Sequence, residues 1–178
     1  MTSTVNPQPD LQTTAPELDT AGRAQVADGL RRLTADFFAL YVKTKNYHWH
    51  MRGRHFRDYH LLLEEQGQQL FAAIDPLAER GRKLGFATLR SIGEIAQLQR
   101  VADDNATQVS PADMLRHLAN DNRCLAQAMR ELHERCDEIQ DVATASILEN
   151  YIDEAEGRTW FLAETASSED TTGAASAL

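Results

Sequence analysis

The 178-residue chain is long enough for one domain with its own hydrophobic core, and a second domain is not required. Its content of 42% hydrophobic and 25% charged residues is that of an ordinary globular protein, and no apolar run approaches the roughly 18–20 residues that cross a bilayer, which argues against a membrane protein. The formal net charge of −9 argues against unaided nucleic-acid binding, which relies on Lys and Arg at phosphates, and favours a protein that attracts cations.

The sequence predicts a cytoplasmic protein. We expect no signal peptide, because the N-terminus has no apolar segment behind a basic start. Cys124 and Cys136 fall in one predicted helix, where a rise of about 1.5 Å per residue separates them by roughly 18 Å. They cannot bridge each other there, and two unpaired thiols suit a reducing compartment. We interpret both as small packing residues.

The N-terminal half predicts an arm followed by two long helices. Residues 1–20 carry three prolines and little apolar periodicity, which predicts a mobile arm. A helix is expected from about Ala21 to Met51, because apolar residues recur there every three or four positions. Gly53 ends it. The second helix should run from about His55 to Leu84, and Pro76 inside it should kink the helix or open a turn.

The long connection that follows, residues 85–109, has no sustained period, although Ile92 to Gln99 could form a short helix across the bundle. Ser110 followed by Pro111 is a strong signal for the start of a third long helix, which continues through Cys136. A fourth helix is expected from about Val142 to Thr165.

Residues 167–178 again have the composition of a mobile tail. Four helices within residues 21–166 therefore predict an all-α fold. One long crossover between the second and third helices, carrying a short extra helix, matches the ferritin-like four-helix bundle.

Four potential ligands lie on one stripe of the second helix. At 100° per residue, Glu64, Asp75 and Glu79 fall about 40°, 60° and 100° from His60. The two pairs are roughly 16 Å apart, whereas metal–ligand bonds are about 2.0–2.2 Å, so one copy cannot close a site with all four groups. Two antiparallel copies related by a two-fold axis near Leu70 could do so twice. The alternative is a solvated, weakly salt-bridged helix face.

The same region resembles the Dps family, the ferritin-like DNA-protection proteins of starved bacteria, over roughly residues 30–164. The resemblance is carried by His48-Trp49, His60 twelve residues later, Glu64, and Asp75 and Glu79 inside an AER segment. It implies a di-iron ferroxidase centre divided between subunits across a two-fold axis. The implied iron ligands are His48, His60 and Glu64 from one subunit and Asp75 and Glu79 from its neighbour.

The resemblance also implies a function and partners. We expect a miniferritin that binds Fe(II), oxidises it with hydrogen peroxide or oxygen, and stores ferric mineral in a hollow, twelve-subunit shell, which protects DNA from oxidative damage. The rival hypothesis is a nucleoid-associated protein that shields DNA by coating it. Because both predicted arms are acidic, we expect DNA binding to be weak or to depend on divalent cations.

Two residues depart from the family pattern. Glu64 stands where Asp is frequent, and its extra methylene could move or weaken the ligand. His50 stands where many members have Asn and could be an extra ligand or a donor to one, but it points about 200° from His48 on an unbroken helix, so we favour a role outside the site. Trp49 is implied to donate electrons that quench radicals, or it packs at the dimer contact. The remaining histidines have no partner at ligand spacing and are interpreted as surface or packing residues: His55, His117 and His133.

Two charged clusters remain. Basic residues near both ends of the second helix are interpreted as a solvated rim: Arg52, Arg54, Arg57, Arg80, Arg82 and Lys83. Acids where the third helix ends and the fourth begins are either a solvated loop or, as the resemblance implies, the lining of a pore for iron: Glu134, Asp137, Glu138 and Asp141. If they are not the entrance, the next candidates are Glu149, Asp153 and Glu154.

Overall fold

The chain forms four long helices and one short one, as seen in a computed structural model that describes residues 12–173. The elements are α1 (Thr20–His50), α2 (Phe56–Lys83), α3 (Ile92–Leu98), α4 (Pro111–Glu138) and α5 (Val142–Gly173). The described residues contain no strand. The predicted all-α, ferritin-like bundle is therefore confirmed, and α3 is the expected short helix of the crossover.

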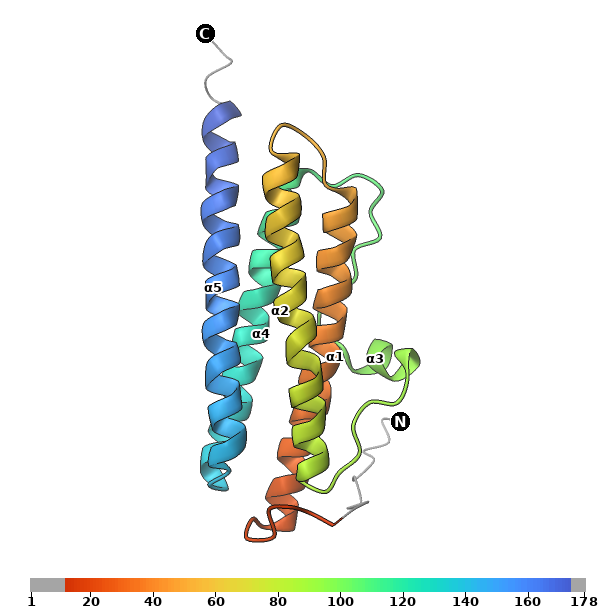
Figure 1. Cartoon of the computed structure of the whole chain (residues 1–178), viewed down its shortest axis with the longest axis vertical. Coiled ribbons are helices and arrows are strands. Elements are labelled where there is room, and N and C mark those ends of the chain that lie inside the picture. The colour runs from red at the N-terminus through yellow and green to blue at the C-terminus, as the bar shows by residue number, and fades with distance from the viewer. Residues whose placement is uncertain (1–11, 174–178) are drawn as a thin grey trace.

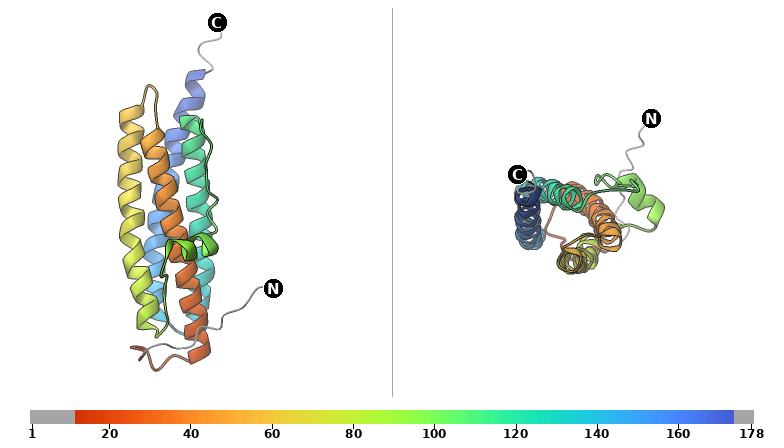
Figure 2. Two further views of the ribbon diagram at one scale, coloured as in Figure 1. Left: turned by 90° about the vertical axis from the view of Figure 1, so that its right-hand side faces the viewer. Right: turned by 90° about the horizontal axis from the view of Figure 1, so that it is seen from above.

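The long helices lie side by side, with α1 antiparallel to α2 and α4 antiparallel to α5, while α3 lies outside them beside α1 (Figures 1 and 2). The α1–α2 pair and the α4–α5 pair are joined mainly through α1 and α4. The core between them is built from large apolar side chains that are almost completely buried, including Phe37, Leu40, Leu63, Leu70, Leu118, Met129, Leu148 and Leu162. No helix of the described residues has a stretch long and apolar enough to cross a membrane.

Local capping explains where the helices begin. The side chain of Ser110 accepts a hydrogen bond from the backbone N–H of Asp113 at 3.1 Å, and Pro111 occupies the first turn, as the sequence predicts. Asp19 caps α1 by accepting from the N–H groups of Ala21 and Gly22. Between α1 and α2, Gly53 turns the chain with φ of 115°, a conformation that glycine adopts without steric cost.

Two features can be compared with the prediction. Of the two effects expected at Pro76, a kink or a turn, the turn is absent, because α2 is continuous there. Helix α5 continues to Gly173, past the predicted end near Thr165, so residues 167–173 are helical rather than part of a tail. Residues 1–11 and 174–178 of the predicted arms lie outside the described residues.

The last part of the predicted N-terminal arm is attached to the bundle. The backbone N–H of Thr14 donates to the carbonyl of Lys83 at 3.0 Å, and the Thr14 hydroxyl donates to the same oxygen at 3.1 Å. Ala15 is buried and belongs to the core. The physical reason is that the final carbonyls of a helix have no partner within it, and this segment supplies donors to the end of α2.

Candidate metal centre

The centre of the candidate site is a reciprocal pair of histidines, one from the last turn of α1 and one from the first turns of α2. The rings of His48 and His60 are stacked, with centroids 3.6 Å apart and an interplanar angle of 21°. Nδ1 of His48 lies 2.8 Å from the carbonyl oxygen of His60, and Nδ1 of His60 lies 2.9 Å from the carbonyl oxygen of His48. Each residue thus fixes the ring of the other.

These contacts determine which ring nitrogens can bind a metal. A carbonyl oxygen can only accept a hydrogen bond, so both Nδ1 atoms must carry a proton. In a neutral ring the lone pair is then on Nε2, and a metal-binding histidine is commonly oriented by such a bond from its other nitrogen. His48 and His60 therefore present two Nε2 atoms with the tautomer that metal binding requires.

Glu64 brings a carboxylate to the same place. Its Oε2 lies 3.2 Å from Nε2 of His48. Two ligands that bind one ion at about 2.1 Å and at right angles are roughly 3.0 Å apart, so this spacing fits a shared metal. Despite its extra methylene compared with Asp, Glu64 reaches the histidine pair. Carboxylate oxygen together with imidazole is a donor set that Fe(II) accepts.

Two polar neighbours of Glu64 keep its carboxylate charged. Lys45 forms an ion pair with Oε2, and the side-chain amide of Gln68 donates to Oε1 at 3.2 Å. The hydrogen bond from Lys45, followed by that from Gln68, lowers the pKa of Glu64 below its ordinary value. Sequence reasoning missed both residues, although Gln68 lies one helical turn after Glu64 and Lys45 one turn before Trp49.

The second predicted pair lies apart from the first. Asp75 and Glu79 are exposed on α2, and Glu79 contacts Lys83 at 3.4 Å. Across residues 12–173, no group of three or more His, Cys, Asp or Glu side chains in one chain is arranged to hold a metal ion. A single chain thus stacks His60 on His48 and places Glu64 beside His48, without a complete three-ligand site, and it leaves Asp75 and Glu79 elsewhere on α2.

Exposed apolar side chains surround this part of the molecule. Trp49 is 64% exposed, with its ring 6.0 Å from Nζ of Lys45, and Phe71 is 57% exposed beside Tyr41. Phe56 lies against His60 with ring centroids 5.0 Å apart. Large exposed aromatic groups of this kind commonly mark an interaction surface.

The remaining histidines have other partners. Nδ1 of His50 donates to the carbonyl of Asn46 in its own helix at 2.8 Å, and the residue is exposed. His133 lies between two carboxylates, at 3.3 Å from Asp137 and 3.0 Å from Glu149. The spacing of four residues between His133 and Asp137 was a sequence signal for this contact. None of these rings joins the His48–His60 pair.

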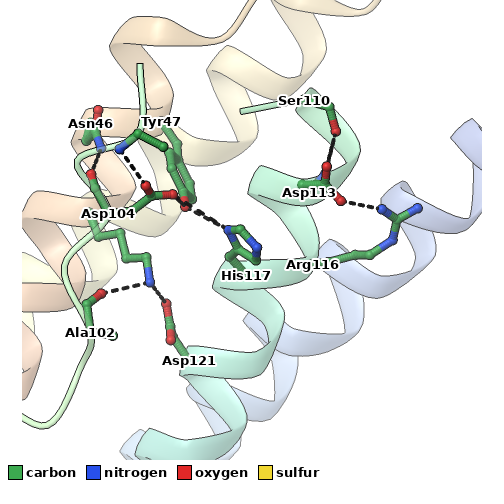
Figure 3. A network of polar contacts seen from close by, with 11 residues as sticks. Asn46, Tyr47, Ala102, Asp104, Ser110, Asp113, Arg116, His117 and Asp121 are labelled. Atoms are coloured by element: carbon green, nitrogen blue, oxygen red, sulfur yellow. Dashed lines mark hydrogen bonds and ion pairs between the residues drawn. The ribbon is translucent and has the colours of Figure 1, made fainter. Parts of the chain in front are cut away.

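A third polar network fixes the segment before His48 (Figure 3). The hydroxyl of Tyr47 donates to a carboxylate oxygen of Asp104 in the crossover, and Nδ1 of His117 on α4 lies 3.0 Å from the same hydroxyl. Burial, followed by the bond to Asp104, raises the pKa of Tyr47, so the phenol stays protonated. The hydrogen bond from Tyr47 in turn lowers the pKa of Asp104. Sequence analysis interpreted His117 as a surface or packing residue, and the residue is indeed exposed, but it did not identify this network.

Two predictions about charged residues need correction. Asp141 is buried, pairs with Arg80 at 2.6 Å, and accepts from the N–H of Thr144 at 3.0 Å, so it caps the start of α5. It cannot line a pore, and Arg80 does not belong to a solvated rim. The other acids of that cluster are exposed, as are the three arginines of the α1–α2 turn: Glu134, Asp137, Glu138, Arg52, Arg54 and Arg57.

Comparison with known proteins identifies the family of the chain. The ferritin-like domain family matches residues 27–169. DNA protection during starvation protein 1 of Deinococcus radiodurans is 33% identical over 137 residues, which cover 77% of this chain and 66% of that protein. The structure of Dps from Thermosynechococcus elongatus is 30% identical, with a TM-score of 0.79 over 82% of this chain and 92% of that one.

A Dps protein from Vibrio cholerae O1, described as a member of a broad superfamily of ferritin-like diiron-carboxylate proteins, is 26% identical. Its TM-score is 0.79, and the match covers 83% of this chain and 92% of that one. Sequence and fold comparisons agree, and the chain belongs to the Dps family of ferritin-like proteins.

Proposed function

We propose that this protein is a miniferritin with ferroxidase activity, whose substrate is Fe(II). The observation that supports this most directly is the His48–His60 pair, in which the reciprocal bonds use both Nδ1 atoms and Nε2 of His48 faces the Glu64 carboxylate. In the neutral rings, each Nε2 atom carries no proton, and the Nδ1 bonds keep the rings from rotating. Two imidazoles and one carboxylate form a half-site for iron that needs further oxygen ligands.

The missing ligands would come from a second copy of the chain. In this proposal Asp75 and Glu79 of a two-fold related subunit complete the centre, and they are free to do so because both are exposed. The aromatic side chains around the half-site provide apolar area for such a contact, above all Trp49 and Phe71. Six such dimers would form the hollow shell of twelve subunits that the family resemblance implies.

Each residue has a defined part in the reaction. The histidines and carboxylates bind Fe(II), hydrogen peroxide or oxygen takes its electrons, and the ferric product is stored as mineral inside the shell. Trp49 would donate electrons that quench radicals formed on the way. Packing at the two-fold contact is an equal alternative for its exposed ring.

The proposed benefit to the cell is protection of DNA. Removal of Fe(II) and peroxide together would suppress hydroxyl-radical damage in the cytoplasm, in keeping with the names of the Deinococcus relative and others. Direct DNA binding should be weak or require divalent cations, since the net charge is −9. The rival function, coating of DNA, predicts tight binding in a gel-shift titration that does not depend on the iron ligands.

The test is replacement of one histidine of the pair. In His60→Ala we expect the initial rate of Fe(II) oxidation by peroxide to fall by about tenfold or more, since loss of even an outer-shell partner of a metal ligand costs roughly 10–100-fold. His55→Ala is the matched control, because His55 is exposed one turn away and contacts only the ring of Tyr59 among the aromatic pairs. A wild-type rate in folded His60→Ala would refute the proposal.

A further inference from the structure

The end of α1 is held from two opposite sides. His48 reaches towards α2 through its bond to the carbonyl of His60, while the preceding residues reach towards the crossover. The side chain of Asn46 donates to the backbone oxygen of Asp104 at 3.1 Å, and the hydroxyl of Tyr47 donates to the carboxylate of the same residue. One crossover residue thus binds two consecutive residues of α1 that directly precede His48 (Figure 3).

The bonds to Asp104 restrain α1 at its C-terminal end, which is the part of a helix that opens most easily. The last carbonyls of a helix lack partners within it, so the final turn is the part that opens first. His48 lies in the final turn of α1, two residues before the helix ends at His50. The reciprocal bonds with His60 can form only while that turn stays helical, because they use the backbone carbonyl of His48 as well as its ring.

Asp104 is itself held firmly. Its other carboxylate oxygen accepts from the backbone N–H of Ala106 at 2.9 Å, which fixes the turn of the crossover. From α4, His117 contacts the Tyr47 hydroxyl from a third direction. The contact is well shielded, since the Tyr47 side chain is buried and that of Asp104 is only 15% exposed.

The crossover has further anchors along α1 that do not involve Asp104. Arg100 binds the buried carboxylate of Asp36 through its backbone N–H at 2.6 Å and its guanidinium at 2.6 and 2.9 Å. Lys43 donates to the carbonyl of Ala102 at 2.9 Å and pairs with Asp121 at 2.7 Å. Removal of the Asp104 side chain should therefore loosen the final turn of α1 at Tyr47 without detaching the crossover, which keeps these anchors and the bond from Asn46 to the backbone oxygen of residue 104.

We propose that Asp104 is a positioning residue for the iron centre, which holds the last turn of α1 so that the His48 ring stays in place beside His60. The role in iron oxidation rests on the proposed function, whereas the restraint on the helix end is a property of the chain alone. Asp104 does not bind the metal. Its carboxylate acts through the hydroxyl of Tyr47, whereas its backbone oxygen, which any side chain at this position would keep, holds Asn46.

The test measures the helix end and the metal site separately. In Asp104→Ala we expect the backbone amides of residues 47–50 to exchange with deuterium about tenfold faster, because hydrogen bonds to charged groups restrain such openings by that order. We expect the affinity for Co(II), used as a redox-stable probe, to fall about tenfold. Asp103→Asn is the matched control, since the neighbouring Asp103 is exposed and contacts Gln99 instead.

A double-mutant cycle assigns the effect to the contact itself. Tyr47→Phe should lower Co(II) affinity by a similar factor, and the combination with Asp104→Ala should be no worse than either change alone. Unchanged exchange in Asp104→Ala would overturn the proposal whether or not the protein oxidises iron. If Asp104→Ala exchanged faster but kept the wild-type affinity for Co(II), the proposal would also be overturned, and Asp104 would only stabilise the end of α1. Failure of His60→Ala to affect Co(II) binding would instead refute the proposed function.

Discussion

At the scale of single residues, the Glu64 carboxylate has two interactions to compare: its ion pair with Lys45 and its proposed bond to iron. Its carboxylate faces the ring nitrogen of His48, where we place the iron, and it also pairs with Lys45. The ammonium keeps the carboxylate ionised but competes with the metal for it. The net effect of Lys45 on metal affinity should therefore change with pH.

Lys45→Met separates the two effects. At pH 7 Glu64 is ionised with or without Lys45, so the variant loses only the competing charge, and Co(II) affinity should rise by about fivefold. As the pH falls, the pKa of Glu64 in the variant, which is no longer lowered by Lys45, returns towards 4.5. The carboxylate then protonates earlier than in the wild type, and the gain should disappear near that pH.

Lys45→Arg is the control for this prediction, because it keeps the positive charge and should keep the wild-type affinity at pH 7 within a small factor. Calorimetric titration with Co(II) at pH 7 and at pH 4.5, the ordinary pKa of the Glu64 carboxyl group, measures both proteins. Weaker binding by Lys45→Met than by Lys45→Arg at pH 7 would show that Lys45 supports the site rather than competes within it.

At the scale of helices, close contact between α1 and α4 depends on a glycine. A Cβ atom built on Gly29 would lie 2.5 Å from a methyl carbon of Leu132, which is itself buried. Gly157 on α5 is also helical, but nothing lies within 4 Å of its built Cβ. Alanine at Gly29 therefore adds both a steric clash and a higher helix propensity, whereas alanine at Gly157 adds only the higher helix propensity.

We expect Gly29→Ala to reduce the free energy of unfolding by about 1 kcal/mol. Overpacking against Leu132 costs about 1–3 kcal/mol, and alanine returns up to about 1 kcal/mol in helix propensity. Gly157→Ala should instead raise it by up to about 1 kcal/mol. Denaturant unfolding at one protein concentration measures both variants, since association also contributes to stability. A stabilised Gly29→Ala would mean that Leu132 moves aside at little cost.

Local sequence signals predicted the helices well, whereas contacts between distant segments stayed hidden. The cap at Ser110 could be predicted because it depends only on the residues that follow it in the sequence. The periodicity of apolar residues predicted the bounds of α1 and α2 to within a few residues. The bond between Arg80 and Asp141 joins residues 61 positions apart, and no spacing rule reveals it. Its burial overturned the predicted role of Asp141 in a pore.

In the candidate site, too, the local relation between residues could be predicted and the contacts between helices could not. His60 and Glu64 share a helix face, which the spacing of four residues predicts. The approach of His48 from another helix followed from the family resemblance and not from periodicity. The reciprocal bonds to backbone carbonyls could not be predicted, because they depend on how the α1–α2 turn brings two helix ends together.

At the scale of the whole molecule, the proposed set of ligands is complete only with a partner. One chain supplies His48, His60 and Glu64 at one place on its surface, while Asp75 and Glu79 lie further along α2. An isologous contact about an axis near Leu70 would bring the two groups together twice. Complete metal binding then depends on dimer formation, so a change that breaks the contact between subunits should abolish both.

Phe71→Glu tests that link. Phe71 lies on the same stripe of α2 as the ligands, is 57% exposed in the single chain, and would be buried in the contact. A carboxylate there would lie near its symmetry-related copy, and burying two like charges is unfavourable by several kcal/mol. We expect light scattering to show loss of the large assembly, with species approaching the 19.9 kDa chain, and Fe(II) oxidation to fall with it.

Gln127→Glu supplies the control, because it changes the net charge by the same amount at an exposed position on α4. It should keep the wild-type mass and oxidation rate, so that any effect of Phe71→Glu reflects its place on α2. If Phe71→Glu kept the wild-type mass and activity, the axis would lie elsewhere. If it lost mass but kept activity, His48, His60 and Glu64 would suffice for oxidation, and the partner's acids would have no part in it.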